Sequence, residues 1–252
     1  MKVSIITVTY NSEKTLQRTI DSVINQDYKY IEHIIIDGGS ADGTVEIINK
    51  NQAYIAKSIS EKDSGMYEAL NKGICLSTGD IIGILNSDDV FAGSNIISKV
   101  VECFERNNSD ILYGNLKYVS TNQPENKTIR YWKSNAFNPK KLKYGWMPPH
   151  PTLFCKKEIF KRYGLYNESL KIASDYDFIL RIFRHQDLRI DFLPIVMVKM
   201  TVGGKSNGTL KNICKKSHED LKAIKANNVG SFYTLILKNL RKLGQLYNAN
   251  EQ

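Results

Sequence analysis

The first 90 residues alternate short apolar runs with amphipathic stretches. Four runs have the length and β-branched content of buried strands, at residues 3–9, 31–36, 55–60 and 81–85. Three amphipathic stretches predict helices between and after them, at residues 12–24, 44–49 and 66–76. Ser12 is placed to cap the first helix. Repeated β-α-β units imply an α/β fold, with a parallel sheet covered by helices on both faces.

The pattern changes near residue 110. After a helix at 96–104, residues 111–119 and 128–132 are typical of an antiparallel hairpin. Ser174 is placed to cap a helix through 178–183, and 190–202 is strand-like with Pro194 interrupting it. Two helices, near 210–227 and 232–247, close the chain. These changes divide the chain into segments of about 1–110, 111–206 and 207–252.

Composition favours a folded protein in a reducing compartment. Apolar residues make up 42% of the chain. No window approaches the roughly 18 uninterrupted apolar residues of a membrane-spanning helix. The N-terminus enters a strand at once, without the shape of a signal peptide. The four cysteines are scattered, so we expect buried thiols and a cytoplasmic location.

The net charge of +9 is concentrated at the C-terminus, where nine Lys or Arg face three acidic residues from Lys205 onward. Within 232–247, apolar residues lie on one side and Lys238, Arg241 and Lys242 flank them, as in a helix lying in a lipid interface. We expect 207–252 to bind an anionic membrane, at the inner face of the cytoplasmic membrane. The alternative is packing onto the rest of the chain or onto a second subunit, as a homodimer. Nucleic acid is a less suitable partner, because the basic residues alternate with apolar ones.

Acidic and amide residues follow the predicted strands, at the sheet edge where α/β proteins bind ligands. Asn86, Ser87, Asp88 and Asp89 come directly after a buried strand. Two carboxylates at this spacing can hold Mg²⁺ or Mn²⁺ and leave room for substrate phosphates. The alternative is an ordinary turn.

Three further polar groups have both a binding and a structural interpretation. Asp37 could accept a hydrogen bond from a base or ribose, or form an Asx turn before Gly38. Lys72 could bind phosphate at a helix that opens near Asp63, or remain a solvated lysine. Asp175, in the first turn of a helix, could be a general base or a charge that stabilises the helix start.

The order and spacing of seven segments resemble the family-2 glycosyltransferases, inverting enzymes of the GT-A fold, over about residues 1–206. The segments are SIITVTYN at 4–11, IDGGSADGT at 36–44, SEKDSGMY at 60–67, NKG at 71–73, LNSDD at 85–89, PHPTLF at 149–154 and SDYD at 174–177. The detail is similar to bacterial members that assemble surface polysaccharides. The resemblance implies a Rossmann-like, mostly parallel nucleotide-binding sheet in a nucleotide-sugar half at about 1–110. It also implies an antiparallel acceptor half at 111–206 and a C-terminal helical extension.

The resemblance also implies a reaction and its residues. A sugar would pass from a nucleotide-sugar donor, a UDP-sugar, to a glycan or polyprenyl-diphosphate-linked acceptor, with Mn²⁺ or Mg²⁺ as cofactor. Asp175 would be the catalytic base, and Asp88 and Asp89 would hold the metal. Donor-binding positions would be Thr7, Thr9, Tyr10, Asp37, Asp63, Asn71, Lys72, Asn86, Ser87 and Asp88. Two positions depart from the family: Asn86 stands where many members have Asp, and Ser174 replaces a common Glu.

Three other residues are candidates for acceptor or diphosphate binding. Trp146 could stack on a sugar ring, with plain packing as the alternative. His150, between two prolines, could line the acceptor site or make a structural hydrogen bond. Lys205 lies in a Gly-rich segment that could close over the donor.

Two other functions compete with transfer. A sugar-phosphate nucleotidyltransferase needs a glycine-rich loop after the first strand, where this chain has none. A non-catalytic nucleotide-sugar-binding subunit would not need the three carboxylates Asp88, Asp89 and Asp175.

Overall fold

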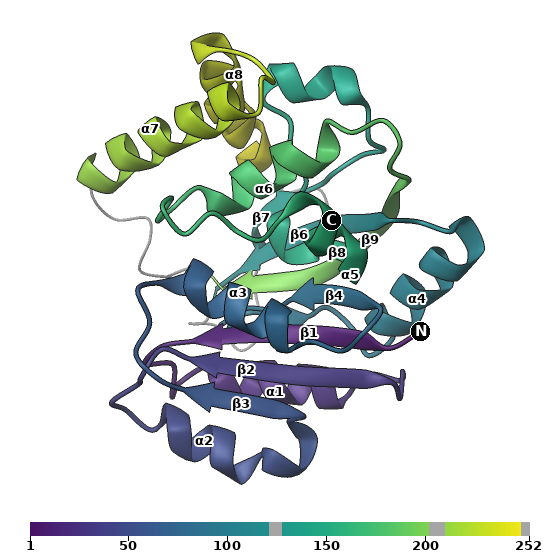
Figure 1. Cartoon of the computed structure of the whole chain (residues 1–252), viewed down its shortest axis with the longest axis vertical. Helices are drawn as coiled ribbons and strands as arrows, with labels where there is room; N and C mark the ends of the chain where they lie inside the picture. Colours follow the sequence, from purple (N-terminus) through teal and green to yellow (C-terminus); the bar gives the residue numbers. More distant parts are fainter. Residues whose placement is uncertain (121–127, 202–209, 248–252) are drawn as a thin grey trace.

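The computed structural model describes residues 1–120, 128–201 and 210–247, with the backbone alone at 210–211 and 242–247. Its centre is a nine-stranded sheet in the order β3-β2-β1-β4-β8-β6-β9-β5, with β7 paired to β6 (Figure 1). The strands are β1 (Val3–Thr9), β2 (Ile31–Asp37), β3 (Lys57–Ser60), β4 (Ile81–Ile84), β5 (Val90–Phe91), β6 (Ile111–Val119), β7 (Thr128–Trp132), β8 (Phe154–Lys156) and β9 (Ile190–Thr201).

The first four strands are parallel, and β8 then introduces antiparallel pairing with β4 and β6. Strands β6 and β9 are again parallel, and β6 and β7 form the antiparallel pair predicted from the sequence. A mostly parallel sheet with an antiparallel second part is therefore confirmed. The register of β6 and β9 shifts near Pro194, which has no N–H to donate to a sheet ladder.

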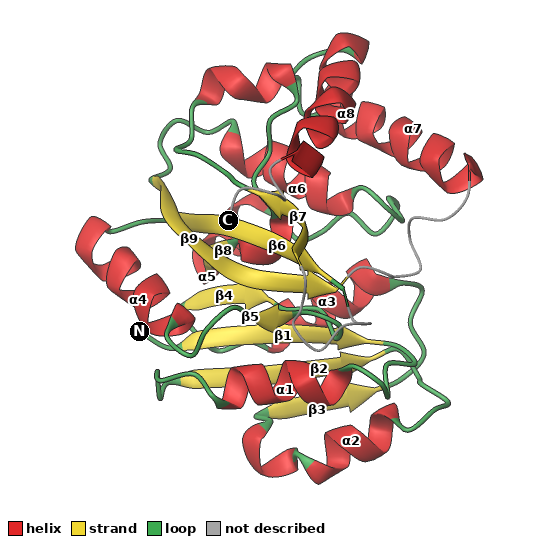
Figure 2. Ribbon diagram, turned by 180° about the vertical axis from the view of Figure 1, so that it is seen from behind, coloured by secondary structure: helices red, strands yellow, loops and turns green. Residues whose placement is uncertain are grey.

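Helices cover both faces of the sheet (Figures 1 and 2). They are α1 (Leu16–Ile24), α2 (Thr44–Lys50), α3 (Met66–Leu76), α4 (Ile96–Asn107), α5 (Lys157–Tyr163), α6 (Ser174–Phe183), α7 (Leu210–Ala226) and α8 (Phe232–Tyr247). Helices α3, α5 and α6 bury their apolar sides on one face, in a cluster that contains Ile6, Leu70 and Phe178. Helices α1 and α4 pack on the other face.

Three local predictions were wrong. Helix α1 begins at Leu16, and the Ser12 side chain does not cap it; instead the Ser12 carbonyl accepts the N–H groups of Thr15 and Leu16. Ser174 lies inside the first turn of α6, whose N-cap is Ala173. Strand β3 starts at Lys57, two residues later than predicted, because a short 3₁₀ helix occupies Gln52–Tyr54.

The two C-terminal helices pack on the rest of the molecule: α7 lies beside α6, and α8 packs on α7, β7 and residues 139–144 (Figure 1). Ala223 and Ile224 of α7 and Leu235 of α8 are buried in the same apolar cluster as α3 and α6. Among the described residues, no helix is both long and apolar enough to cross a lipid bilayer.

Candidate active site

The candidate site lies at the carboxyl ends of the parallel strands. The register sets Thr9 of β1 opposite Asp37 of β2, and Asp37 opposite Ser60 of β3. The turn after β4 ends at the same edge, where Thr201 of β9 donates its hydroxyl to the Asp88 carbonyl at 2.8 Å. Sequence segments almost 200 residues apart therefore meet at one edge of the sheet.

The turn after β4 is rigid and buried. The Asp89 N–H donates to the Asn86 carbonyl at 3.0 Å, and the Asn86 amide donates back to Asp89 Oδ2 at 3.0 Å. Thr19 of α1 donates to the Asp89 carbonyl at 2.8 Å. Asp89 has no exposed surface, whereas Asp88 is half-buried. Of the two carboxylates, Asp88 is thus the one open to a ligand.

Burial makes the two carboxyl groups unusual. It raises the pKa of Asp88, and burial together with the neighbouring Asp88 charge raises the pKa of Asp89 well above its usual range. Asp89 Oδ1 is buried and has no hydrogen-bond partner among the described residues. A divalent cation held by Asp88 and Asp89 would supply the missing counter-charge, so these residues fit a metal. Within residues 1–120, 128–201 and 210–247, no three His, Cys, Asp or Glu side chains cluster as ligands of one ion.

Asp175 lies half-buried in the first turn of α6. Its Oδ1 accepts the N–H of Tyr176 at 2.8 Å and, at 3.4 Å, the hydroxyl of Tyr67 from α3. The Tyr67 hydroxyl also donates to the Ile172 carbonyl at 2.9 Å. Burial, and after it the charge of Asp175, raises the pKa of Tyr67, so its phenol stays a donor.

Asp175 is connected to the sheet edge through Tyr67, which lies in the first turn of α3, the helix that follows the carboxyl end of β3. Tyr118, near the end of β6, has a raised pKa, chiefly because it is buried. The Arg130 guanidinium lowers that pKa, and the charges of both Asp89 and Asp175 raise it. The Asp88–Asp89 turn follows the carboxyl end of β4, so this turn and the Tyr67–Asp175 contact both lie at the carboxyl ends of the parallel strands.

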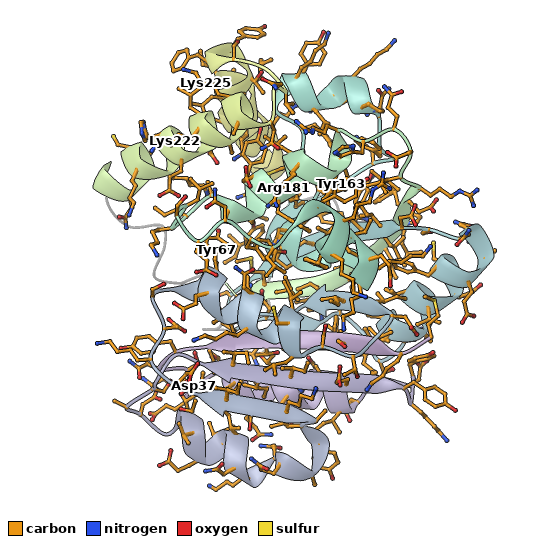
Figure 3. All side chains as sticks on the ribbon, in the orientation of Figure 1. Asp37, Tyr67, Tyr163, Arg181, Lys222 and Lys225 are labelled. Carbon is orange, nitrogen blue, oxygen red and sulfur yellow. The ribbon has the colours of Figure 1, made fainter. Side chains whose placement is uncertain are left out.

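The β1–β2 side offers fewer free groups than the sequence suggested. Asp37 is fully buried and accepts from the Gly39 and Ser40 N–H groups and from the hydroxyls of Ser40 and Ser60. It thus forms the Asx turn that was the alternative interpretation, with no surface left for a base. Figure 3 shows it at the end of β2, on the same side of the molecule as Tyr67.

Thr7 is also occupied, because its hydroxyl lies 3.0 Å from His33 Nε2 in the core. Tyr10 is 57% exposed just after the end of β1, whereas Thr9 is buried. Ser87, predicted as a donor contact, bonds the Ser12 hydroxyl at 2.9 Å. This bond joins the loop after β1 to the turn at residues 86–89. Ser12, which the sequence indicated only as a helix cap, is therefore a further candidate for the site.

The residues around α3 have partners within the protein. The Asn71 amide donates to the Tyr166 carbonyl at 2.9 Å and its Oδ1 accepts the Tyr166 N–H at 2.9 Å, a buried and structural arrangement. Lys72 pairs with Glu61 and Glu68, both at 2.8 Å. Asp63 Oδ1 accepts the Gly65 N–H at 3.0 Å, and the side chain lies against the loop after β2, since a Cβ at Gly38 would lie 2.7 Å from Asp63 Oδ2.

Of the three acceptor-side candidates, two can be placed. Trp146 is buried against Tyr113, Phe137 and Phe183, so stacking on a sugar was the wrong interpretation and packing the right one. His150 Nε2 lies 2.7 Å from the Tyr166 hydroxyl. Burial lowers the pKa of His150, and the charge of Asp175 acts in the opposite direction. Lys205 lies outside the described residues.

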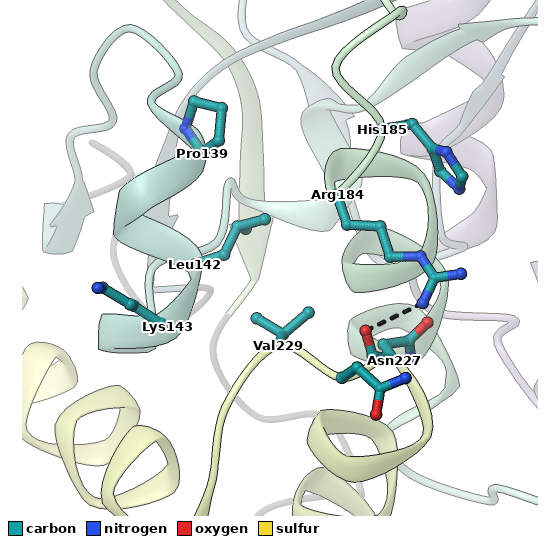
Figure 4. Close-up of a pocket in the computed structure, with 8 residues that line it drawn as sticks. Pro139, Leu142, Lys143, Arg184, His185, Asn227 and Val229 are labelled. Atoms are coloured by element: carbon teal, nitrogen blue, oxygen red, sulfur yellow. Dashed lines mark hydrogen bonds between the residues drawn. The ribbon is translucent and has the colours of Figure 1, made fainter.

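A separate hollow of about 410 Å³ lies between the turn at 139–143, the end of α6 and the α7–α8 loop. In Figure 4, Leu142 and Val229 point into it, whereas Lys143 and His185 point away from it. Arg184 donates to the Asn227 carbonyl at 3.0 Å. The charged groups do not converge there, unlike those at the sheet edge.

Known proteins share both the sequence pattern and the fold. Residues 4–165 match the model of glycosyl transferase family 2. An uncharacterised glycosyltransferase of Mycobacterium tuberculosis (strain CDC 1551) is 33% identical over 184 residues, 71% of this chain and 68% of that protein. A PGL/p-HBAD biosynthesis glycosyltransferase of Mycobacterium bovis (strain BCG) is 29% identical over 209 residues, 81% of this chain and 78% of that protein.

Two solved structures share the architecture. S. aureus TarS 1-349 in complex with UDP-GlcNAc superposes with a TM-score of 0.72 at 20% identity, over 91% of this chain and 66% of that chain. Mannosyltransferase PcManGT from Pyrobaculum calidifontis, in complex with GDP-Man and Mn²⁺, gives 0.66 at 16% identity, over 98% and 73%. The fold is therefore GT-A. With the family match, these findings show that the chain belongs to glycosyltransferase family 2.

Proposed function

We propose that this protein transfers a sugar, with inversion, from a UDP-sugar to a hydroxyl of a glycan or polyprenyl-diphosphate-linked acceptor. The observation that carries the proposal is that the Asp88–Asp89 turn and the Tyr67–Asp175 contact both lie at the carboxyl ends of the parallel strands. TarS is complexed with UDP-GlcNAc and with UDP, which supports a uridine donor. The relative in PGL/p-HBAD biosynthesis supports a glycolipid or polysaccharide product.

In this mechanism Asp175 takes the proton of the acceptor hydroxyl as its oxygen bonds to the anomeric carbon. The bond from that carbon to the donor diphosphate breaks on the opposite side, which inverts the configuration. Asp88, with Asp89 behind it, would hold the divalent cation, and the cation neutralises the diphosphate leaving group when bound. Tyr67 holds Asp175 through a hydrogen bond to Oδ1.

The donor and the metal are tested together. Thermal shifts with UDP-, GDP- and TDP-sugars, each with Mn²⁺ or EDTA, should show the largest stabilisation for a UDP-sugar with Mn²⁺. EDTA should reduce transfer on the order of a thousandfold, because the leaving group loses its counter-charge. Asp88→Ala should remove most metal-dependent UDP binding. Undiminished transfer in EDTA would reject the metal role.

The base is tested by Asp175→Asn, which keeps the shape of the side chain and removes its basicity. UDP affinity should survive, and turnover should fall at least about a hundredfold. NMR of the product should show the anomeric configuration opposite to that of the donor. Retention of configuration would reject in-line displacement, and an absence of turnover with every donor would favour the non-catalytic binding subunit.

Helix α8 supports a place for the reaction, at the inner face of the cytoplasmic membrane. Phe232, Ile236 and Leu240 repeat every four residues and are 61%, 41% and 54% exposed, whereas Leu235 is buried. Lys238 does not face lipid as predicted, because it is buried against Asp220. The sequence 232–247 contains Lys and Arg and no Asp or Glu, so its exposed side suits an anionic lipid surface.

Liposome sedimentation tests this surface. The protein should pellet with phosphatidylglycerol vesicles at low salt and be released at high salt. Phe232→Ser with Ile236→Ser should abolish pelleting, while Tyr30→Ser, which changes an even more exposed aromatic residue in another part of the molecule, should not. If the intact protein does not pellet at low salt, membrane binding by α8 is rejected. The exposed side of α8 would then be expected to bind another partner, such as a second subunit.

A further inference from the structure

The segment that leads into Asp175 is held from two sides. From α3, the Tyr67 hydroxyl donates to the Ile172 carbonyl. From α7, Glu219 Oε2 accepts the N–H groups of Ile172 at 2.7 Å and of Ala173 at 3.0 Å. The first N–H groups of a helix have no partner within it, and a carboxylate there also suits the helix dipole. Glu219, only 5% exposed, thus binds from another helix the N–H groups of the α6 N-cap residue Ala173 and of the residue before it.

The residues that follow Asp175 are also held by the C-terminal helices. Lys238 of α8 places its ammonium 3.4 Å from the ring centroid of Tyr176 and donates to Asp220 of α7 at 2.6 Å. The Asn227 amide donates to Asp177 Oδ1 at 2.8 Å. These contacts are buried, so each would be costly to break. The first turn of α6 is therefore fixed on both sides of Asp175.

Helix α8 packs closely against the segment that contains Lys143 and Gly145. A Cβ at Gly145 would lie 2.4 Å from the Lys238 backbone nitrogen, and Gly145 has a φ of +74°, which favours glycine. The Thr234 hydroxyl donates to the Lys143 carbonyl at 2.7 Å. The Lys238 backbone therefore packs closely against Gly145, while its side chain contacts Asp220 and Tyr176.

We propose that Glu219, Asn227 and Lys238 are positioning residues for Asp175, so that helices α7 and α8 belong to the catalytic apparatus. The proposal rests on the proposed role of Asp175 as base. Glu219 and Tyr67 fix Ile172 and Ala173, and Lys238 and Asn227 fix the next turn. A displacement of about 1 Å at a reacting group can lower turnover about a hundredfold, so this support bears on rate more than on donor binding.

The test uses Glu219→Ala and Glu219→Gln in the full chain, each alone and combined with Asp175→Asn. Glu219→Ala should lower kcat about tenfold to a hundredfold and leave the affinity for UDP with Mn²⁺ unchanged. Glu219→Gln should restore most of kcat, because its amide oxygen can still accept the two N–H groups. Added to Asp175→Asn, Glu219→Ala should lower the residual turnover no further, since it acts through Asp175. Glu102→Ala, on the remote helix α4, is the matched control and should leave kcat unchanged.

The proposal fails if Glu219→Ala keeps wild-type kcat while Asp175→Asn is inactive. That result would still support the proposed role of Asp175 as the base. It also fails if Glu219→Ala lowers the residual turnover of Asp175→Asn by the same factor as it lowers that of the wild type. Glu219 would then affect turnover independently of Asp175. Wild-type turnover in Asp175→Asn would overturn both proposals. If Glu219→Ala does not fold, Asn227→Ala removes a single side-chain contact to α6 and is measured in the same cycle.

Discussion

Acid should destabilise this protein through one buried histidine, His33. It lies in β2 with 2% of its surface exposed, and its Nε2 is 3.0 Å from the Thr7 hydroxyl of β1. Its Nδ1 has no hydrogen-bond partner in the part of the chain that the structure describes. Burial lowers the pKa of His33 from 6.5 to about 4. The folded protein therefore holds this imidazole neutral in a range where the unfolded chain protonates it.

The sign and the size of the effect follow from this difference. Below pH 6.5 His33 is protonated in the unfolded state, whereas in the folded state it stays neutral down to about pH 4. The free energy of unfolding therefore decreases as the pH falls from 6.5 to about 4. A difference of about 2.5 pKa units corresponds to about 3 kcal/mol. For a protein of this size, that loss of stability lowers Tm by about 6–12 °C.

The assay is urea unfolding, followed by circular dichroism between pH 4 and 8, for the wild type, His33→Gln and His218→Gln. Gln at position 33 cannot titrate and can still bond Thr7, so the wild type should lose about 3 kcal/mol more than this variant between pH 6.5 and 4. His218 is exposed on α7 and serves as the control, which should follow the wild type. A constant difference between the wild type and His33→Gln across this range would refute the reasoning.

Three substitutions separate structural from functional roles. Asp89→Asn removes a buried charge, so in EDTA at pH 7 urea unfolding should show a more stable protein, while Mn²⁺-dependent UDP binding weakens. Trp146→Ala should lower the free energy of unfolding by about 3–5 kcal/mol and leave UDP affinity unchanged; lost affinity in a stable protein would restore a sugar-binding role. Lys238→Met leaves Asp220 buried and unpaired and should cost about 3–5 kcal/mol, much of which adding Asp220→Asn should recover.

The elements that the sequence predicted well are those whose signal is local. The β-branched runs and helical spacings determine the strands and helices of the first half, and the acidic segments at the strand ends determine the edge where the site forms. The hydrogen bonds of Asp37 and Asn71 could not be predicted in this way, because Ser60 and Tyr166 reach them only after folding. Carboxylates and amides serve equally well as ligands and as structural acceptors, and only burial distinguishes the two roles.

The C-terminal segment shows the same limit. Its apolar spacing predicts helices, and both helices form. The spacing could not indicate that Lys238 turns inward, because its partners Asp220 and Tyr176 are distant in sequence. No motif in the sequence marked Glu219 as a functional residue. An acidic residue followed by an apolar stripe in a helix is too common to mark a cap on another helix.

The position of β9 in the sheet has a consequence for synthesis. Strand β5, which directly follows Asp89, pairs only with β9 among the described strands, through Phe91 and Val198. The Thr201 hydroxyl reaches Asp88 across 113 residues of sequence. A ribosome that adds about 5–20 residues per second needs roughly 5–20 s to make that interval. The nascent chain therefore carries its acidic turn without the contact from β9 until the last strand emerges, and a fragment that ends before residue 190 would lack that contact permanently.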